Sequence, residues 1–465
     1  YINDIDIIRE LPEVIRKEYL VTVIAHEEQI LGIEQGNTEN VMYGVAVDIG
    51  TTTIAAYLYN LRTGKKIDVY SILNPQSKYG ADVLSRIEYT NNSSLNQMEM
   101  HNLIIECINR IIHIFEENNG ISKEDIYSIV FAGNTTMIHF LMNLPAKYLA
   151  VSPFIPVTTR LNKIKPAKLG ININKRGLII AIPCVSAYIG ADTVAAVLSS
   201  NMNKLDDICL LIDIGTNGEI VLGNKNWMYS CSTAAGPAFE GANIQYGVGG
   251  IKGAIDKISF KDKLEYHTIG SLKALGICGS GIVDAAAGML DKGIIDETGR
   301  IIDKDEALQE NQALGVDYVN RLVDIDRMNC FILAKKEETE INNDIVITQK
   351  DIRELQNAKA AIAAGIKVLI KQAGISGKDI KTVCLAGGFG NYINVNSAFK
   401  IGLLPSDLDV KHVISIGNAA GAGAVEGLLS KHNLGEMEII KDKIKYIELS
   451  SMIDFVDEYV DCMFF

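Results

Sequence analysis

The sequence lacks the features that define several large protein classes. Its eight cysteines are dispersed and form no C-x-x-C pair, which excludes a local zinc or iron–sulfur ligand set. No apolar run reaches the roughly 18 residues that are needed to span a bilayer. Basic residues are outnumbered, with 44 Lys and Arg against 57 Asp and Glu, and the formal net charge is −13. We therefore expect neither a membrane nor a nucleic acid as a partner.

The common nucleotide-binding signatures are also missing. There is no G-x-x-x-x-G-K-[ST] motif, so a P-loop is excluded. The glycine-rich stretches at 247–253 and 417–427 do not have the spacing of the dinucleotide fingerprint. Any nucleotide site in this chain must therefore be of another kind.

The composition itself is that of an ordinary globular protein. Hydrophobic residues make up 48% of the 465 positions and charged residues 22%, which predicts ample core and roughly two or three domains. The cysteines lie mostly in apolar segments, as buried thiols do, and a reducing cytoplasm is the expected compartment. Because the chain begins with Tyr1 rather than Met, we expect that an N-terminal region is missing.

The phrase Asp-Ile-Gly-Thr occurs twice, each time directly after an apolar run. The copies are residues 48–51 and 213–216, and a second apolar stretch follows each, at 54–58 and 220–222. This pattern predicts a buried strand, a tight turn and a second strand, forming a β-hairpin with an acid at its mouth. A single copy is also typical of an ordinary turn, since Asp and Gly both favour turns. Two copies with matching flanks, about one domain length apart, argue against that interpretation.

The two turns predict a site for a magnesium-bound nucleotide. Glycine lets the backbone approach a ligand closely, and the N–H groups of a turn bind phosphate oxygens. A carboxylate beside a phosphate is favourable when a hard cation such as Mg²⁺ lies between them. Two such hairpins, one in each half of the chain, therefore predict two similar lobes closing on a metal–nucleotide complex.

Each predicted phosphate loop contains one acidic residue that we expect to bind Mg²⁺. In the first loop this is Asp48, acting through water, and the cofactor-binding residues are Gly50, Thr51, Thr52 and Thr53. In the second loop it is Asp213, and the cofactor-binding residues are Gly215, Thr216, Asn217 and Gly218. Glu219 either joins the metal shell or orients water as a catalytic residue, and a surface acid on an edge strand is the alternative.

Two glycine-rich segments are candidates for the adenosine side of the site. Gly387, Gly388, Phe389 and Asn391 follow a predicted strand at 380–386, and a strand that ends in Gly-Gly lets a flat ligand approach. Gly279, Ser280 and Gly281 open a predicted helix and offer free N–H groups. Asp284, one turn later, either reaches a ribose hydroxyl or caps the helix, and we favour the cap.

Several further residues have two interpretations. Asp192, at the start of a predicted helix at 189–199, is a candidate catalytic acid, and the alternative is a first-turn acid favoured by the helix dipole. The string at 80–83 is similar to the one around Asp192, at 190–193, and it follows the segment 74–76. This segment is interpreted as lining a substrate cleft or a partner surface. His139 is interpreted as a packed helix residue rather than a base.

The order of predicted elements divides the chain into three parts. Residues 1–42 are too few for a core of their own. Residues 43–200 form the first lobe and 201–465 the second, with a charged, weakly periodic insertion near 295–345 and a helix at 349–373 opened by the N-cap signal Thr348-x-x-Asp351. In both lobes strands come first and then alternate with helices. This predicts an α/β fold with a mixed sheet flanked by helices, in duplicate.

These segments, in this order, resemble the motifs of the actin-like ATPase superfamily, which includes sugar kinases and heat-shock chaperones. The match covers about residues 43–430 and includes two connecting segments, at 132–139 and 417–424, the second interpreted as a hinge between lobes. The resemblance implies two ribonuclease H-like lobes with a nucleotide cleft between them, and ATP with Mg²⁺ as cofactors.

Four stretches narrow the resemblance to the reductive activators of corrinoid proteins: 43–53, 74–83, 132–137 and 386–390. That family uses ATP to return Co(II) corrinoid to Co(I) in methyl-transfer pathways of anaerobes. The resemblance implies an ATPase that acts on a Co(II) corrinoid protein and forms a homodimer. Family members carry an iron–sulfur domain ahead of a linker and middle domain. We therefore expect the cluster and the electron-transfer domain only in a missing N-terminal region, with residues 1–42 as the tail of the middle domain.

Three other functions compete with this one. A kinase for a sugar or carboxylate on the same fold needs a catalytic base, and only Asp192 is a candidate. A nucleotide-gated scaffold would bind ATP without turnover. An activator of a radical dehydratase would share an iron–sulfur cluster between subunits, and Cys231 and Cys278 are the cysteines to test for it.

Overall fold

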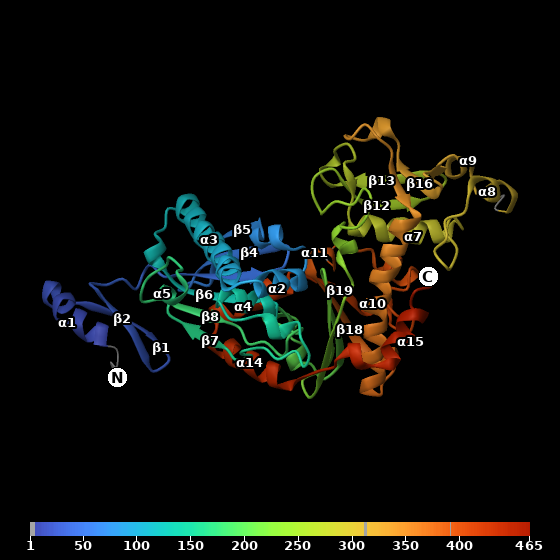
Figure 1. Ribbon diagram of the computed structural model, residues 1–465. Coiled ribbons are helices and arrows are strands. Elements are labelled where there is room, and N and C mark those ends of the chain that lie inside the picture. The colour runs from blue at the N-terminus through green and yellow to red at the C-terminus, as the bar shows by residue number, and fades with distance from the viewer. Residues whose placement is uncertain (1–4, 311–313, 391) are drawn as a thin grey trace. The chain divides into compact units, whose positions relative to one another are not determined.

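The computed structural model describes residues 5–310, 314–390 and 392–465 (Figure 1). The chain divides into two compact units, which are described separately. The first consists of Tyr1–Ser199 and Ala419–Lys443, and the second of Ser200–Asn418 and Ile444–Phe465.

A six-stranded mixed sheet forms the centre of the first unit, in the order β5-β4-β3-β6-β8-β7. Its strands are β3 (Tyr43–Ile49), β4 (Thr53–Asn60), β5 (Lys65–Leu73), β6 (Ile126–Gly133), β7 (Asn162–Ile164) and β8 (Leu178–Ala181). Strands β5, β4 and β3 pair antiparallel, whereas β3, β6 and β8 pair parallel. The interior of β3 is almost wholly buried, as expected for a strand with both faces covered.

Helices cover this sheet. They are α2 (Val83–Asn91), α3 (Ser94–Asn119), α4 (Thr135–Leu141), α5 (Pro166–Leu169), α6 (Ala191–Ser199), α13 (Ala419–Leu429) and α14 (Lys431–Lys443). Helix α13 packs closely on α6, because a side chain at Gly423 would collide with the backbone of Ala195. The Ser199 hydroxyl donates to the Ala419 carbonyl at 2.8 Å. Residues 419–443, which the sequence analysis placed in the second lobe, therefore pack with the first unit.

A small N-terminal element precedes this sheet. It consists of α1 (Ile5–Glu18) and a two-stranded hairpin of β1 (Val21–His26) and β2 (Gln29–Gln35). Polar contacts attach it to the rest of the first unit: Tyr127 donates its hydroxyl to Glu34 at 2.8 Å, and Arg176 donates to Glu10 at 2.9 Å.

The second unit repeats the arrangement of five of these strands, in a sheet of the order β19-β18-β9-β10-β11-β20, whereas its sixth strand, β20, lies beside β11 and so at the opposite edge from β7. Its strands are β9 (Ile208–Ile214), β10 (Gly218–Gly223), β11 (Met228–Thr233), β18 (Ile380–Ala386), β19 (Val413–Gly417) and β20 (Ile444–Tyr446). Strands β11, β10 and β9 pair antiparallel, and β9, β18 and β19 pair parallel. The expected α/β fold, with a mixed sheet in each half, is confirmed.

Two three-stranded sheets complete the second unit, β13-β12-β14 and β15-β16-β17. Their strands are β12 (Ala254–Phe260), β13 (Leu264–Thr268), β14 (Gly276–Ile277), β15 (Leu322–Ile325), β16 (Met328–Ala334) and β17 (Ile345–Thr348). The segment 295–345, predicted only as a weakly periodic insertion, thus contributes β15 and β16, and it buries Phe331 and Leu333 in the main core of this unit.

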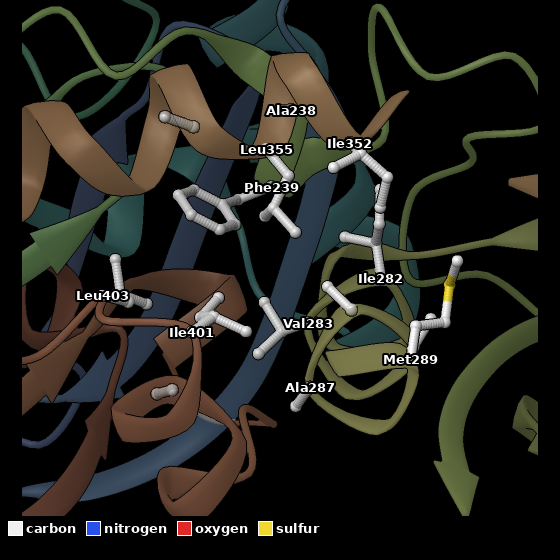
Figure 2. Close-up of a cluster of buried hydrophobic side chains, with 14 of the residues drawn as sticks. Ala238, Phe239, Ile282, Val283, Ala287, Met289, Ile352, Leu355, Ile401 and Leu403 are labelled. Atoms are coloured by element: carbon white, nitrogen blue, oxygen red, sulfur yellow. The ribbon is translucent and has the colours of Figure 1, made fainter. Parts of the chain in front are cut away.

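The helices of the second unit surround that core. They are α7 (Gly279–Asp291), α8 (Lys304–Glu310), α9 (Val316–Val319), α10 (Gln349–Ala373), α11 (Gly387–Gly390), α12 (Val395–Lys400) and α15 (Ile453–Asp461). Figure 1 shows α15 lying along α10, in agreement with their contacts. Figure 2 shows how Phe239, from the 3-10 turn η5 (Pro237–Glu240), packs among side chains of α7 and α10 such as Val283 and Leu355.

Candidate nucleotide site

The first Asp-Ile-Gly-Thr copy forms the predicted hairpin. Asp48 is the penultimate residue of β3 and lies opposite Ala55 of β4 and beside Ala132 of β6. The N–H of Gly50 donates to the Thr53 carbonyl at 3.0 Å and closes the turn. A Cβ at Gly50 would lie 2.6 Å from that oxygen, so only glycine fits here.

Buried side chains hold this turn from one side. Arg86 of α2 donates through Nη2 to the Thr51 carbonyl at 2.7 Å, and Asn74 donates through Nδ2 to the Gly50 carbonyl at 2.9 Å. The N–H of Asn74 donates to the Thr52 carbonyl at 2.9 Å. In a trans peptide the next N–H points opposite to the carbonyl, so the N–H groups of Thr51–Thr53 are directed away from these supports.

The segment 74–76 is therefore structural, and its interpretation as a cleft or partner surface is wrong for its polar residues. Asn74 and Gln76 are both fully buried. Gln76 donates through Nε2 to the Met100 carbonyl at 2.8 Å, which ties the segment to α3. The burial of this segment is explained by the turn. Water does not reach the carbonyl groups of the turn, so these groups need hydrogen-bond donors from the protein.

Asp192 belongs to the surroundings of the first turn. It lies in the first turn of α6 and accepts a hydrogen bond from its neighbour Thr193 N–H at 2.7 Å. A Cβ at Gly190 would lie 2.7 Å from Asp192 Oδ1 and 2.5 Å from the Cα of Asn134, so these groups are close together. Burial raises the pKa of Asp192 to about 6, against the lowering effect of the Thr193 bonds.

His139 is a packed helix residue, as expected. It is fully buried, its Nδ1 contacts the Thr135 carbonyl at 2.7 Å and its Nε2 accepts from the Val157 N–H at 3.0 Å. Burial lowers its pKa.

The second Asp-Ile-Gly-Thr copy also forms a hairpin, with a shorter turn. The N–H of Gly215 donates to the Asn217 carbonyl at 2.9 Å, and Gly218 packs against Ile362 of α10. Glu219 lies directly opposite Asp213 in the antiparallel pair, so both side chains are on the same face.

Glu219 is not an edge-strand acid, because β10 lies between β9 and β11. Its carboxylate accepts from the Ser232 hydroxyl at 3.3 Å. The interpretation of Glu219 as a surface acid on an edge strand is therefore wrong, because β10 is not an edge strand.

The two segments predicted for the adenosine both lie near the second hairpin. Gly387 follows β18 with φ of +87°, and a Cβ there would lie 2.7 Å from Asp213 Oδ1. Phe389 stacks on Phe239 with ring centroids 4.6 Å apart, and a side chain at Gly279 would collide with Phe239. Gly388 has open space around its Cβ position, and Asn391 lies outside the described residues.

The residues near the start of α7 also make contacts within the second unit. Ser280 is buried and donates its hydroxyl to the Asp256 carbonyl at 2.9 Å, and a side chain at Gly281 would collide with Ile255 of β12. The small residues here allow α7 to pack on β12. Asp284 does not cap α7, since the N-cap residue is Cys278 and its side chain makes no capping bond.

The carboxylate of Asp284 instead joins two other elements. It accepts from the Ser397 hydroxyl at 2.6 Å and from the Ile258 N–H at 3.3 Å. Burial raises its pKa. The favoured interpretation as a cap is therefore wrong.

Three residues of the site were missed by sequence reasoning: Arg86, Phe239 and Glu240. Glu240 accepts from the Thr216 hydroxyl at 3.0 Å, so it contacts the second Asp-Ile-Gly-Thr turn although 24 residues separate the two. The string Gly236-Pro237-Ala238-Phe239-Glu240-Gly241, a turn between two glycines, was the available signal. No local sequence pattern predicts that Arg86 donates to the Thr51 carbonyl.

The cysteines named for a shared cluster are both buried. Cys231 contacts the Gly365 carbonyl and Cys278 the Ile255 carbonyl. In the part of the chain that the structure describes, no three His, Cys, Asp or Glu side chains gather as a metal-binding group. Over the same residues, no helix is both long and apolar enough to cross a membrane.

Two family models match the chain. The model described as the C-terminal domain of RACo, the ASKHA domain, matches residues 207–465, and the RACo middle region matches residues 43–205. ASKHA domains have the actin-like fold, which agrees with the duplicated mixed sheets. The middle-region model thus covers the residues of the first sheet.

Individual proteins give the same result. The chain is 37% identical over 446 residues to the corrinoid activation enzyme RamQ of Eubacterium limosum, covering 95% of this chain and 74% of that protein. It is 24% identical over 445 residues to the [Co(II) methylated amine-specific corrinoid protein] reductase of Methanosarcina barkeri, covering 87% and 73%. A solved structure titled reductive activator for corrinoid, iron-sulfur protein matches with a TM-score of 0.87 and 35% identity, covering 99% of this chain and 72% of that one. The chain therefore belongs to the RACo family of corrinoid activators, as the resemblance of the stretches 43–53, 74–83, 132–137 and 386–390 indicated.

Proposed function

We propose that this chain is an ATP-dependent reductive activator of a corrinoid protein, which couples ATP binding and hydrolysis to the reduction of Co(II) to Co(I). The observation that carries the proposal is the 37% identity to a corrinoid activation enzyme over 95% of the chain. The two turns supply the chemistry such an activity requires, because each combines an acid with a glycine-closed loop.

Each of the two turns, taken by itself, carries a donor that fits magnesium. Asp48 and Asp213 offer hard carboxylate oxygens, and Mg²⁺ keeps several of its waters and takes one or two carboxylates together with phosphate oxygens. We assign Asp48 and Asp213 as these carboxylates, each in its own turn. The ion would supply charge neutralisation for the leaving phosphate, and the turn N–H groups would bind the phosphate oxygens.

The adenosine is assigned to the second unit. Gly387 brings the backbone beside Asp213, and two residues further on the half-buried Phe389, which stacks on the buried Phe239, presents an aromatic face. We therefore assign the adenine and the phosphate contacts of the second turn to neighbouring loops of this unit.

ATP serves as an energy source for reduction only through differential affinity. Reducing Co(II) to Co(I) is uphill for ordinary cellular donors. A nucleotide-bound activator shifts its partner to a more easily reduced state only by as much as it binds that state more tightly. The attraction between activator and corrinoid protein must therefore depend on the bound nucleotide.

The test combines a Co(II) corrinoid protein, a low-potential chemical reductant and the purified chain. With Mg-ATP we expect the Co(II) absorbance to decay to that of Co(I), together with phosphate release that the corrinoid protein stimulates. Asp213→Ala should abolish turnover and leave the circular dichroism spectrum unchanged. ATP-dependent phosphorylation of a sugar or carboxylate without cobalt reduction would overturn the proposal, and sedimentation analysis of the same sample tests the expected homodimer.

A further inference from the structure

The two Asp-Ile-Gly-Thr copies differ in the direction of their threonine hydroxyls. In the first turn, Asn134 donates through Nδ2 to Thr51 Oγ1 at 3.0 Å. The Asn134 amide cannot be reversed without losing its other bond, because its Oδ1 accepts the Met137 N–H at 2.9 Å as the N-cap of α4. The Thr51 oxygen is therefore an acceptor in this contact, which leaves its hydrogen for donation to another group.

In the second turn the polarity is reversed. Thr216 Oγ1 lies 3.0 Å from Glu240 Oε1, and an ionised carboxylate only accepts. The single hydroxyl hydrogen of Thr216 is thus committed to Glu240. The Thr216 oxygen still accepts hydrogen bonds through its lone pairs. It has no second hydrogen to donate to an anionic phosphate oxygen.

Glu240 is held firmly in this position. It is the last residue of η5, and its neighbour Phe239 is 2% exposed in the core (Figure 2). Gly241 follows with φ of +85°, and a Cβ there would lie within 2.5 Å of the Val248 backbone. The N–H of Gly241 donates to the Ala238 carbonyl at 3.0 Å. A carboxylate on so constrained a turn fixes the hydroxyl of Thr216 in one orientation.

We propose that Thr216 and Glu240 form a hydrogen-bonded pair in which the Thr216 oxygen accepts from the water that attacks the γ-phosphate and so orients it. This inference rests on the proposed ATPase function. A water molecule is a small group with hydrogens to donate, and it satisfies an acceptor-only oxygen at a phosphate turn. Thr216 contacts the water, and Glu240 is a positioning residue that acts through Thr216.

The step is balanced without an external reactant. The water oxygen forms a bond to the γ-phosphorus as the bond from that phosphorus to the β,γ-bridging oxygen breaks, and ADP leaves. A water proton passes to Thr216 Oγ1 while the hydroxyl hydrogen of Thr216 passes to Glu240, which then releases it to solvent.

The test compares four variants of the full chain in steady-state ATP hydrolysis with the corrinoid protein present. Thr216→Val and Glu240→Gln should each lower kcat on the order of 100-fold, with the KM for Mg-ATP within about threefold of the parent value. The double variant should be no slower than the slower single variant, because the two side chains act as one unit. Thr216→Ser, which keeps the hydroxyl, should retain most of kcat.

A matched control lies in the same unit. Thr298 donates its hydroxyl to Asp296 at 2.6 Å, away from the turns, and Thr298→Val should leave kcat and KM unchanged. An increase in KM with kcat preserved in Glu240→Gln would show that Thr216 binds phosphate or metal, and would overturn the inference. Unchanged kinetics would overturn it as well. If the parent chain itself hydrolyses no ATP, the proposed function fails instead.

Discussion

The guanidinium of Arg86 donates through Nη2 to the main-chain carbonyl of Thr51 at 2.7 Å, and it does so while fully buried. Its Nε donates to the Gly80 carbonyl at 2.9 Å. Burial lowers the pKa of Arg86 to about 10, so the group stays charged at neutral pH. One arginine thus links the segment before α2 to the first Asp-Ile-Gly-Thr turn.

Removing this arginine should destabilise the first unit. In Arg86→Met two carbonyl oxygens lose their donor, at about 1–3 kcal/mol each, and we expect the free energy of unfolding to fall by about 3 kcal/mol. Urea denaturation followed by circular dichroism measures the change. Arg62 donates to the Glu39 carbonyl at 2.9 Å on the surface, and Arg62→Met should change stability by less than about 0.5 kcal/mol. Equal losses in both variants would contradict the assigned role.

Gly387→Ala should impair the second turn specifically. The residue has φ of +87°, and the added Cβ would lie 2.7 Å from Asp213 Oδ1, so the carboxylate must move. We expect ATP turnover to fall at least about 10-fold, since misplacing a site group by an ångström costs up to about 100-fold.

The control for the backbone strain is Gly374→Ala. Gly374 has φ of +65° with open space at its Cβ position, at the C-terminal end of α10. This variant should lose about 1 kcal/mol of stability from the positive φ alone and keep normal ATP turnover. A similar loss of turnover in both variants would show that strain, not displacement of Asp213, is responsible.

Phe389→Ala should weaken nucleotide binding. Loss of the stacked pair with Phe239 removes about 0.5–1.5 kcal/mol of aromatic contact and the proposed wall for adenine, and we expect the KM for Mg-ATP to rise about 3- to 10-fold. Phe455 makes an aromatic pair with Tyr459, 6.2 Å between centroids, on the distant helix α15. Phe455→Ala should lower thermal stability without changing KM. An unchanged KM in Phe389→Ala would remove this residue from the site.

Asp192 should make stability depend on pH. Burial raises its pKa from 3.8 to about 6, so between these values the folded chain retains a proton that the unfolded chain has lost. The folded state binds more protons in this window, and its stability falls as pH rises from about 4 to 6, by roughly 2–3 kcal/mol. In Asp192→Asn this contribution is absent.

The measurement is the difference in unfolding free energy between variant and parent at several pH values. We expect the unfolding free energy of Asp192→Asn to increase relative to that of the parent as pH rises from 4 to 6.5. Asp305, an exposed acid in the first turn of α8, is the control, and Asp305→Asn should show no such trend. Parallel pH profiles for Asp192→Asn and the parent would refute the buried-acid interpretation.

Local sequence signals predicted the elements whose limits depend on nearby residues. Helix α10 spans 349–373 as predicted, because Thr348 and Asp351 form a reciprocal capping box at its start and Gly374 ends it in the left-handed conformation. The hairpins around Asp48 and Asp213 were predicted for the same reason. The segment 295–345 was not, since its strands are stabilised by distant partners in the core.

The sequence by itself determined that two Asp-Ile-Gly-Thr turns exist and that each presents an acid beside a glycine-closed loop. Only the tertiary structure decided what the two threonines do. Asn134 reaches Thr51 from another strand connection and Glu240 reaches Thr216 from a later turn, and neither partner is part of the repeated motif. A hydroxyl has one hydrogen to give, so its role depends on whether the neighbour that the fold supplies is a donor or an acceptor.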